Sequence, residues 1–401
     1  MFEIRGKYAS AKIFTDNIDQ ESISQIYNIC NMEIFKDQKI RIMPDCHAGI
    51  GCVIGFTSTF DDYIIPNLVG VDIGCGMEVA VIKEKDIDLE KLDKTIHNFI
   101  PSGFDIREEE HSYAAKIDLS ALKCYKHIDA DRAYKSIGTL GGGNHFIEVD
   151  KDTEGNLYLV IHSGSRYLGK QVCEFYQELA YKRLTDVLEK EKEIIERLKK
   201  EGRQKEIQKE IEKIKNQRPH INKKVAYLTG QDLQDYLHDM KITQYFAVLN
   251  RKAIVDEIIK KMRLTVIEQF TTIHNYVDID NKIIRKGSIS AQKNEKVIIP
   301  INMRDGSIIA LGKGNPDWNY SAPHGAGRIM SRREAKENIS LEEFKQAMKG
   351  IYSTTVNEDT IDEAPFVYKP INEIVENTKD TIQIVNIIKP VYNYKHASRN
   401  E

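Results

Sequence analysis

One short segment of the sequence pairs a carboxylate with a thiol. Asp72 and Cys75 lie three residues apart in GVDIGCGM, whose glycines permit turns that other residues do not. A carboxylate and a thiolate on such a loop can face one metal ion. An aspartate in a turn beside a buried cysteine is the commoner interpretation of this segment taken alone.

Three histidines occupy comparable positions further along the chain. His145 follows three glycines, His162 closes an apolar run, and His274 closes another. Each could instead be a histidine of the core or of a turn. The chain has only 11 histidines, so three of them at strand ends or turns favour a shared role.

Together with Asp72 and Cys75, these histidines make five potential metal ligands. A single metal site needs three or four protein ligands, whereas five suit two ions that share a bridging ligand. Cys75 is the expected bridge, because a thiolate is charged and can contact two cations. Cysteine and histidine favour zinc, whereas manganese prefers oxygen and tolerates imidazole, so the residues leave the metal open.

Groups that could bind phosphate lie beside these ligands. The glycines at 141–143 offer backbone N–H groups to a phosphate, although their spacing matches neither a P-loop nor a dinucleotide-binding loop. Ser163, Ser165 and Arg166 could grip a phosphate through hydroxyls and a guanidinium.

The segment 320–333 combines a histidine with glycines and arginines. A histidine exposed beside anion-binding groups, as expected of His324, can attack phosphorus as a neutral imidazole and form a phosphoramidate. A structural hydrogen bond in a turn is an equally weighted alternative. Four cationic side chains could bind RNA or triphosphate phosphates, or form solvated charges or structural salt bridges: Arg166, Lys286, Arg328 and Arg332.

The elements that must hold these side chains are short strands and longer helices. Strands are expected over residues 53–57, 77–82 and 157–161, each beside a candidate segment. A helix is expected over 232–262, and strands and turns return from 273 to 320. These patterns predict an α+β fold with mixed sheets.

Apolar residues recur at helical spacing between Leu184 and Ile214, with Lys and Glu between them. This spacing predicts two amphipathic helices that turn near Glu201 and Gly202. We therefore expect one catalytic domain over residues 1–401, with a helical-hairpin insertion at 184–224. A solvated surface arm is the simplest interpretation of the hairpin, and binding of RNA or a partner is the alternative.

The charge balance and the cysteines limit the class of protein. Lys and Arg number 58 against 61 Asp and Glu, so the formal charge is -3 and any RNA site must be a local patch. Six cysteines are too few for a disulfide scaffold of this length. With no signal peptide and no apolar stretch long enough to span a bilayer, we expect reduced thiols, a cytoplasmic location and no membrane association.

Six segments together resemble the RtcB family of RNA ligases. They are GVDIGCGM, GGGNHFIEV, IHSGSR, the His-Asn pair at 274–275, HGAGRIMSR and DEAPFVYKP. Each is a weak pattern alone, but six in the family's order are highly specific. The resemblance spans roughly residues 40 to 396 and includes MPDCHAGIG at 43–51.

The resemblance implies a fold, cofactors and site residues. It implies a single RtcB-like domain, two Mn²⁺ ions per chain bridged by Cys75, and GTP, which guanylylates His324. The metal ligands that it implies are Asp72, Cys75, His145, His162 and His274. The guanylate-pocket positions that it implies are Asn144, His145, Phe146, Ile147, Glu148, His274, Asn275, Pro300, Asn302, Met303, Ser307, His324, Gly325, Ala326, Gly327 and Lys395.

Two departures indicate a divergent branch of that family. Many members carry a Pro-Gly-Ser-Met loop, where this chain has the altered loop 300–307, with Pro300 and Met303 in register. In this loop Asn302 could replace the hydrogen bond of a hydroxyl group. The chain is also short for the family. Both features point to RNA repair more than to tRNA splicing.

The activity that the resemblance implies is GTP- and Mn²⁺-dependent joining of RNA 3′-phosphate or 2′,3′-cyclic phosphate ends to 5′-hydroxyl ends. An archease-like activator is a candidate partner. Two other classes stay open. One is a dinuclear metal-dependent phosphodiesterase without ligase activity, which would give His324 and Lys395 no function. The other is a non-catalytic relative that binds RNA or a partner protein through the 184–224 hairpin.

Overall fold

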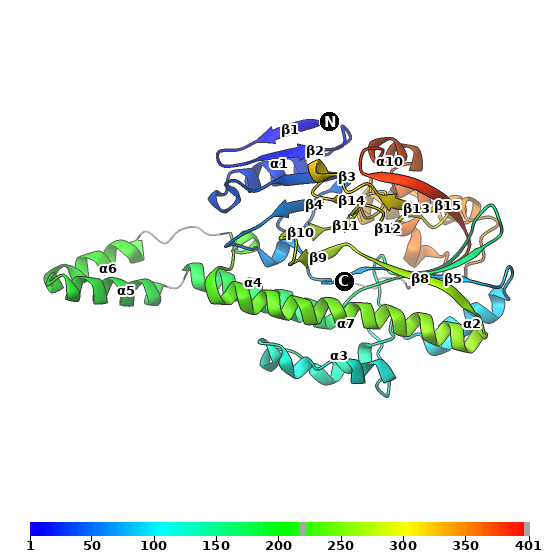
Figure 1. The fold of residues 1–401 in the computed structure, drawn as a ribbon, viewed down its shortest axis with the longest axis horizontal. Helices are drawn as coiled ribbons and strands as arrows, with labels where there is room; N and C mark the ends of the chain where they lie inside the picture. The colour runs from blue at the N-terminus through cyan, green and yellow to red at the C-terminus, as the bar shows by residue number, and fades with distance from the viewer. Residues whose placement is uncertain (186, 217–221, 397–401) are drawn as a thin grey trace.

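The described part of the chain forms three β-sheets with helices packed around them, and this α+β architecture confirms the expected fold class (Figure 1). The structure, a computed structural model, describes residues 1–185, 187–216 and 222–396. One sheet has six strands in the order β1 (Phe2–Arg5), β2 (Ser10–Ile13), β3 (Ile40–His47), β4 (Ile54–Thr59), β10 (Ile283–Lys286) and β9 (Asn275–Asp278). A two-stranded sheet pairs β11 (Ser288–Ser290) with β14 (Ser321–Pro323).

The largest sheet has seven strands, and it holds most of the candidate site residues. Its order is β12 (Lys296–Asn302), β13 (Gly306–Gly312), β15 (Ile382–Lys395), β6 (Phe146–Lys151), β7 (Leu157–Ser163), β5 (Gly76–Ile82) and β8 (Val266–Ile273). All of its neighbouring strands are antiparallel. The expected strands at 53–57, 77–82 and 157–161 correspond to β4, β5 and β7.

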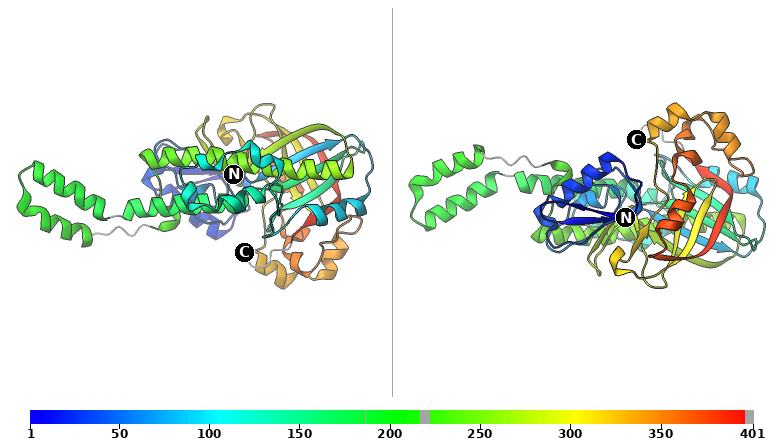
Figure 2. Two further views of the ribbon diagram at one scale, coloured as in Figure 1. Left: turned by 90° about the horizontal axis from the view of Figure 1, so that it is seen from below. Right: turned by 90° about the horizontal axis from the view of Figure 1, so that it is seen from above.

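The helices lie outside the sheets, and the longest runs along the whole body (Figures 1 and 2). The α-helices of the described residues are α1 (Gln20–Cys30), α2 (Leu89–Phe99), α3 (Ala130–Ser136), α4 (Arg166–Thr185), α5 (Val187–Lys200), α6 (Ile207–Asn216), α7 (Gly230–Met262), α8 (Arg332–Asn338), α9 (Leu341–Ala347) and α10 (Ile371–Asn377). The helix expected over 232–262 is α7. None of the helices in the described ranges combines the length and apolar character that a bilayer crossing requires.

Strands β5 and β7 are buried on both faces, which explains their nearly continuous apolar sequences. One face packs Ala80, Leu159 and Ile161 against helices α2 and α7. The opposite face packs Val79 and Val160 against strands β12, β13 and β15, because the sheet curls over itself. Each fully buried aliphatic side chain contributes about 1.5–3 kcal/mol, so this packing holds the strands in one register.

That register brings four separate segments to one end of the sheet. In β7, His162 pairs with Met77 of β5 and also with Phe146 of β6. Gly76 of β5 pairs with Ile273 of β8. The residues just outside these pairs, at 75, 145 and 274, are therefore neighbours of His162, although they are far apart in the sequence.

Helices α5 and α6 project from the body as an arm (Figures 1 and 2). The expected insertion at 184–224 includes residue 186 and residues 217–221, which lie outside the described residues. Hydrogen bonds that do not involve α5 or α6 join α4 to the segment that follows the arm. The Gln177 amide of α4 donates to the carbonyls of Lys223 and Ala226 at 2.7 and 2.9 Å. The assignment of one catalytic domain with this insertion stays a prediction.

Replacing residues 186–221 by a short Gly-Ser linker tests that assignment. We expect the free energy of unfolding to change by less than about 1 kcal/mol, because surface changes away from the core usually cost little. Denaturant unfolding followed by circular dichroism measures it. Gln177→Ala is the matched control and should destabilise the chain by roughly 1–3 kcal/mol, since the buried carbonyl of Ala226 and the partly buried carbonyl of Lys223 lose their donor. A linker variant that does not fold would show that the arm belongs to the core.

Candidate active site

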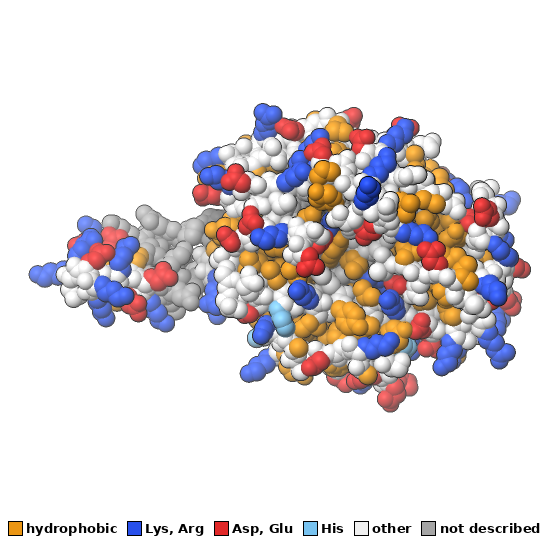
Figure 3. Space-filling model, viewed as in Figure 1, with side chains coloured by type: hydrophobic (Ala, Val, Ile, Leu, Met, Phe, Trp, Pro, Cys, Tyr) orange, Lys and Arg blue, Asp and Glu red, His pale blue; other side chains and the backbone are white. Residues whose placement is uncertain are grey.

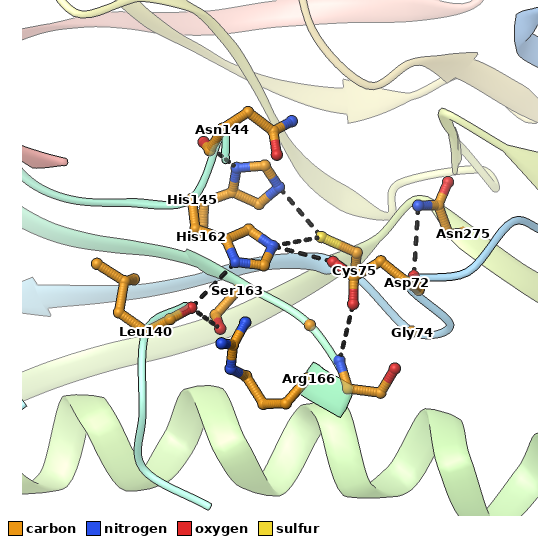
Figure 4. A network of polar contacts seen from close by, with 12 residues as sticks. Asp72, Gly74, Cys75, Leu140, Asn144, His145, His162, Ser163, Arg166 and Asn275 are labelled. Atoms are coloured by element: carbon orange, nitrogen blue, oxygen red, sulfur yellow. Dashed lines mark hydrogen bonds and ion pairs between the residues drawn. The ribbon is translucent and has the colours of Figure 1, made fainter. Parts of the chain in front are cut away.

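A cysteine and two histidines converge at the end of the seven-stranded sheet (Figure 4). The Sγ atom of Cys75 lies 3.4 Å from Nε2 of His145 and 3.3 Å from Nε2 of His162. The potential ligand atoms of these three buried residues all lie within 4.8 Å of one another. Asp72 adds a carboxylate oxygen 2.9 Å from Nε2 of His145. The structure thus brings four of the five expected metal ligands into one cluster.

Backbone carbonyls fix the protonation of both imidazole rings. Nδ1 of His145 lies 3.0 Å from the carbonyl oxygen of Leu140, and Nδ1 of His162 lies 3.1 Å from that of Asn144. A carbonyl can only accept, so each Nδ1 carries the proton and donates it. Nε2 is therefore the nitrogen of each ring that faces Cys75 and can serve as a metal ligand.

His274 adds a third imidazole beside the cluster. Its ring centroid lies 5.1 Å from that of His162, and among the described residues its buried Nδ1 atom has no hydrogen-bond partner. Burial lowers the pKa of both His162 and His274 well below the ordinary value. Both rings are neutral at physiological pH, so they offer lone pairs to a cation.

The charges of Asp72 and Cys75 complete the donor set. Burial raises the pKa of the Cys75 thiol well above its ordinary value, and Asp72 raises it further. Burial opposes ionisation of Asp72 too, but the hydrogen bond and the charge of His145 outweigh it and lower the pKa of Asp72. A Cβ atom at Gly164 would lie 2.1 Å from Oδ1 of Asp72, so only glycine leaves room for this carboxylate. The donor types and the unpartnered Nδ1 of His274 fit bound metal.

Two buried polar residues of α7 hold the cluster from below. Arg251 donates from Nη1 to the carbonyls of Gly74 and Ser163 at 2.7 and 3.0 Å. Asn250 donates to the carbonyl of Gly164 at 3.0 Å. The sequence predicted α7 as a helix but gave neither residue a role. Their signal is a polar run at 250–252 between the apolar residues 246–249 and 253–255.

His324 follows β14 and is oriented by Asp45, a residue of β3. The Asp45 Oδ2 atom accepts from Nδ1 of His324 at 2.7 Å and from the backbone N–H groups of His324 and Gly325 at 3.0 and 3.2 Å. Nδ1 therefore carries the ring proton, and Nε2 carries the lone pair. The ring centroids of His274 and His324 lie 4.8 Å apart. Asp45 lies in the MPDCHAGIG segment, to which the sequence analysis gave no role.

A cavity of about 260 Å³ opens beside His324. Twelve of the sixteen expected guanylate-pocket residues line it: Asn144, Phe146, Glu148, His274, Pro300, Asn302, Met303, His324, Gly325, Ala326, Gly327 and Lys395. Residues of the lining that were not expected there are His47, Ile301, Tyr368 and Asn393. The potential metal ligands His162 and His274 also line the cavity, so the cysteine–histidine cluster and His324 face one space.

Four expected pocket residues lie elsewhere. Ile147 packs in the core on the opposite face of β6, because successive side chains of a strand alternate between faces. Asn275 donates to the carbonyl of Asp72 and accepts from Gly287 N–H, so it braces the metal loop. Ser307 is fully buried in β13, and His145 faces Cys75.

The wall of the cavity carries a network of cations around one carboxylate. Glu363 accepts from Nζ of Lys395 at 2.5 Å and from the hydroxyl of Tyr368 at 2.6 Å, and it lies 3.1 Å from Arg332. Burial raises the pKa of Glu363, but the charges of Lys395 and Arg332 outweigh this effect and lower the pKa to about 2. Glu363 is therefore ionised and holds Lys395 in the cavity wall.

The four candidate phosphate-binding cations have different surroundings. Arg328 and Arg332 line the cavity. Lys286 is buried and donates to the carbonyls of Ile50, Cys52 and Asn67, which engage its ammonium group fully, so its role is structural. Arg166 donates to the carbonyl of Gly103 at 2.9 Å and ties that loop to the site. Over the face shown in Figure 3, charges of both signs are interspersed.

Comparison with known proteins agrees with this geometry. Residues 25–396 match the family model described as tRNA-splicing ligase RtcB. The chain belongs to the RtcB family. It is 28% identical over 425 aligned residues to the RNA-splicing ligase RtcB of Escherichia coli strain K12, and the alignment covers 96% of each chain. It is 27% identical to the tRNA-splicing ligase RtcB of Aeropyrum pernix, over 92% of this chain and 90% of that protein.

A more distant eukaryotic relative also matches along most of the chain. The RNA-splicing ligase RtcB homolog 1 of Entamoeba dispar is 26% identical, over 88% of this chain and 77% of that protein. The RtcB relationship thus spans the metal cluster, His324 and the cavity wall. The relative from E. coli is aligned almost end to end, so a short length does not distinguish this chain from that protein.

The cluster should bind transition-metal ions, and Cys75→Ala should prevent it. Adding Mn²⁺ or Zn²⁺ to chelator-treated protein should raise the free energy of unfolding by about 2.7 kcal/mol at a free metal concentration of 100 Kd. Isothermal titration calorimetry gives the Kd, and denaturant unfolding gives the stabilisation. Cys173→Ala is the matched control, because it removes another buried thiol and should keep the metal response. An unchanged metal response in Cys75→Ala would contradict the assignment.

Proposed function

We propose that this RtcB-family chain is an RNA ligase that joins RNA 3′-phosphate or 2′,3′-cyclic phosphate ends to 5′-hydroxyl ends through a guanylylated His324. The observation that carries the proposal is the position of His324. Its ring lies 4.8 Å from that of His274, beside the Cys75–His145–His162 cluster, and it lines the same cavity as two of the potential metal ligands. The names of the relatives from E. coli and A. pernix support joining of RNA.

Two Mn²⁺ ions, which Asp72, Cys75, His145, His162 and His274 would hold, are part of the proposal. When bound, these ions would supply positive charge that neutralises the phosphates and polarises the reacting phosphorus. Support comes from the two Nε2 atoms that face Cys75 and from the Nδ1 atom of His274, which has no hydrogen-bond partner among the described residues.

The first chemical step is the attack of Nε2 of His324 on the α-phosphorus of GTP. A nitrogen–phosphorus bond forms, the bond from that phosphorus to the α–β bridging oxygen breaks, and pyrophosphate leaves. The proton on Nδ1 stays in place, where Asp45 accepts its hydrogen bond and stabilises the positive charge that develops on the ring. Asp45 thus positions the nucleophile without exchanging a proton.

In the second step an oxygen of the RNA 3′-phosphate attacks the guanylyl phosphorus, and the nitrogen–phosphorus bond breaks. In the third step the 5′-hydroxyl oxygen of the other RNA end attacks the 3′-phosphorus, loses its proton and displaces GMP. A 2′,3′-cyclic phosphate is first opened by water. The cations of the cavity wall, Arg328, Arg332 and Lys395, lie where they can bind the phosphate oxygens.

The nucleotide and its base occupy the cavity in this proposal. Glu148 offers a carboxylate that accepts from the Asn393 amide at 2.6 Å, and burial raises its pKa. Asn302 also lines the cavity, but its side chain accepts from the N–H groups of Arg304 and Asp305 at 3.0 and 2.8 Å. It therefore shapes the altered loop in addition to any contact with nucleotide.

Covalent labelling tests the proposal. Wild-type protein incubated with α-³²P-GTP and Mn²⁺ should gain an acid-labile label of the phosphoramidate type, and His324→Ala should gain none. Asp45→Asn should label about a hundredfold more slowly, because its amide can donate to Nδ1 and reverse the tautomer. Asp61→Asn, which changes an exposed carboxylate, is the matched control and should label like wild type.

A dinuclear phosphodiesterase is the activity that competes with this proposal. It needs the metal cluster but no guanylylated histidine. Wild-type protein that cleaves RNA phosphodiesters and never acquires the label, over a range of divalent metals, would favour that activity and contradict ours. An archease-like activator, cytoplasmic location and a role in repair more than in splicing remain predictions.

A further inference from the structure

We propose that Arg304 and Phe366 form a stacking shelf for an unpaired base of the RNA 3′-phosphate end at the mouth of the cavity. The inference rests on the RNA-joining function proposed above and assigns a subsite to it. Arg304 lies in the turn between β12 and β13. Phe366 lies in the 3₁₀-helix Pro365–Val367.

The guanidinium group of Arg304 lies over the ring of Phe366. The guanidinium carbon of Arg304 lies 5.8 Å from the centre of the Phe366 ring. Phe366 is 41% exposed, although Pro365 and Val367 on either side of it are buried. Isolated exposed rings are ordinary on protein surfaces, but a ring paired with a planar cation is the arrangement on which proteins stack nucleobases.

The shelf is held rigidly. The Arg304 guanidinium donates from Nε and Nη2 to the two carboxylate oxygens of Asp305, both at 3.0 Å. Asn302 accepts from the backbone N–H groups of Arg304 and Asp305 and donates to the Asp305 carboxylate at 2.9 Å. The altered loop therefore fixes its own arginine before any ligand binds, which lowers the entropic cost of stacking.

The shelf borders the cavity on both sides. Met303, next to Arg304, lines the cavity, and so does Tyr368, two residues after Phe366. The N–H of Ile329 donates to the carbonyl of Val367 at 2.8 Å, so the segment that carries His324 is joined to the segment that carries Phe366.

The charges around the shelf select its occupant. Arg328 and Arg332 line the cavity and pair with Glu363, whereas Arg333 and Lys336 of α8 pair with Glu337 and Asp362 and have side chains that are 86% and 49% exposed. The exposed parts of these cations attract a phosphodiester chain rather than an apolar protein segment. Because the Ile329–Val367 hydrogen bond joins the segment of His324 to that of Phe366, we expect the bases before a 3′-phosphate at His324 to reach the shelf.

Fluorescence of 2-aminopurine tests the shelf without any chemical step. The probe is a single-stranded RNA decamer with a 3′-phosphate and 2-aminopurine at the penultimate position, titrated without GTP. Stacking quenches this fluorophore, so wild-type protein should quench it. Phe366→Ala should lose most of the quenching and weaken binding by roughly fivefold or more. Phe366→Trp should restore both, and Arg304→Lys should give an intermediate result, because it keeps the charge but not the plane.

The control Tyr27→Ala removes a ring of similar exposure on α1 and should bind the probe like wild type. Phe366→Ala that quenches and binds like wild type would overturn the shelf, and would leave Phe366 to a protein partner. Stronger quenching of a matched 5′-hydroxyl, 3′-hydroxyl decamer labelled near its 5′ end would overturn the assigned RNA end. Because no GTP is present, failure of His324 to become labelled counts against the proposed function alone.

Discussion

The register of four antiparallel strands is the constraint on which the site depends. Strands β6, β7, β5 and β8 pair so that His162 lies beside Cys75, with His145 and His274 at the ends of the flanking strands. A slip of one residue would turn every side chain of a strand to the other face. The register cannot slip, because β5 and β7 bury apolar side chains on both faces. The packing of the core thus also fixes the geometry of the potential metal ligands.

A common device then prepares the imidazoles. Three of them donate from Nδ1 to an acceptor that cannot donate back: His145 to Leu140, His162 to Asn144, and His324 to Asp45. Two acceptors are carbonyls, which leave Nε2 of each ring facing Cys75. The third is a carboxylate, which suits a ring that must become positive while it attacks phosphorus in the proposed mechanism. The proposed function thus uses the same donor pattern for metal binding in one place and for nucleophilic attack in another.

Local sequence patterns were sufficient to predict the apolar strands and helix α7, because each lies in a run of a few residues. Four of the five expected metal ligands converge in the structure, and their role as ligands stays a prediction. The resemblance supplied positions for the nucleotide pocket, and twelve of sixteen line one cavity. Ile147 and Ser307 do not, because strand alternation and pairing turn them into the core. Asp45 was missed, since it hydrogen-bonds to His324 across 279 residues of sequence. The partners of Arg251 and Glu363 are also distant in the sequence, so local patterns could not predict these contacts.

Anomalous X-ray diffraction from crystals equilibrated with Mn²⁺ tests the paired-metal site most directly. Convergence of one thiol, one carboxylate and three imidazoles predicts two manganese peaks about 3.5–4 Å apart, with Cys75 Sγ within bonding distance of both. His324 should lie beside this pair without binding either ion. A single peak, or peaks that do not contact Cys75, would contradict a shared thiolate and with it the chemistry derived from this cluster.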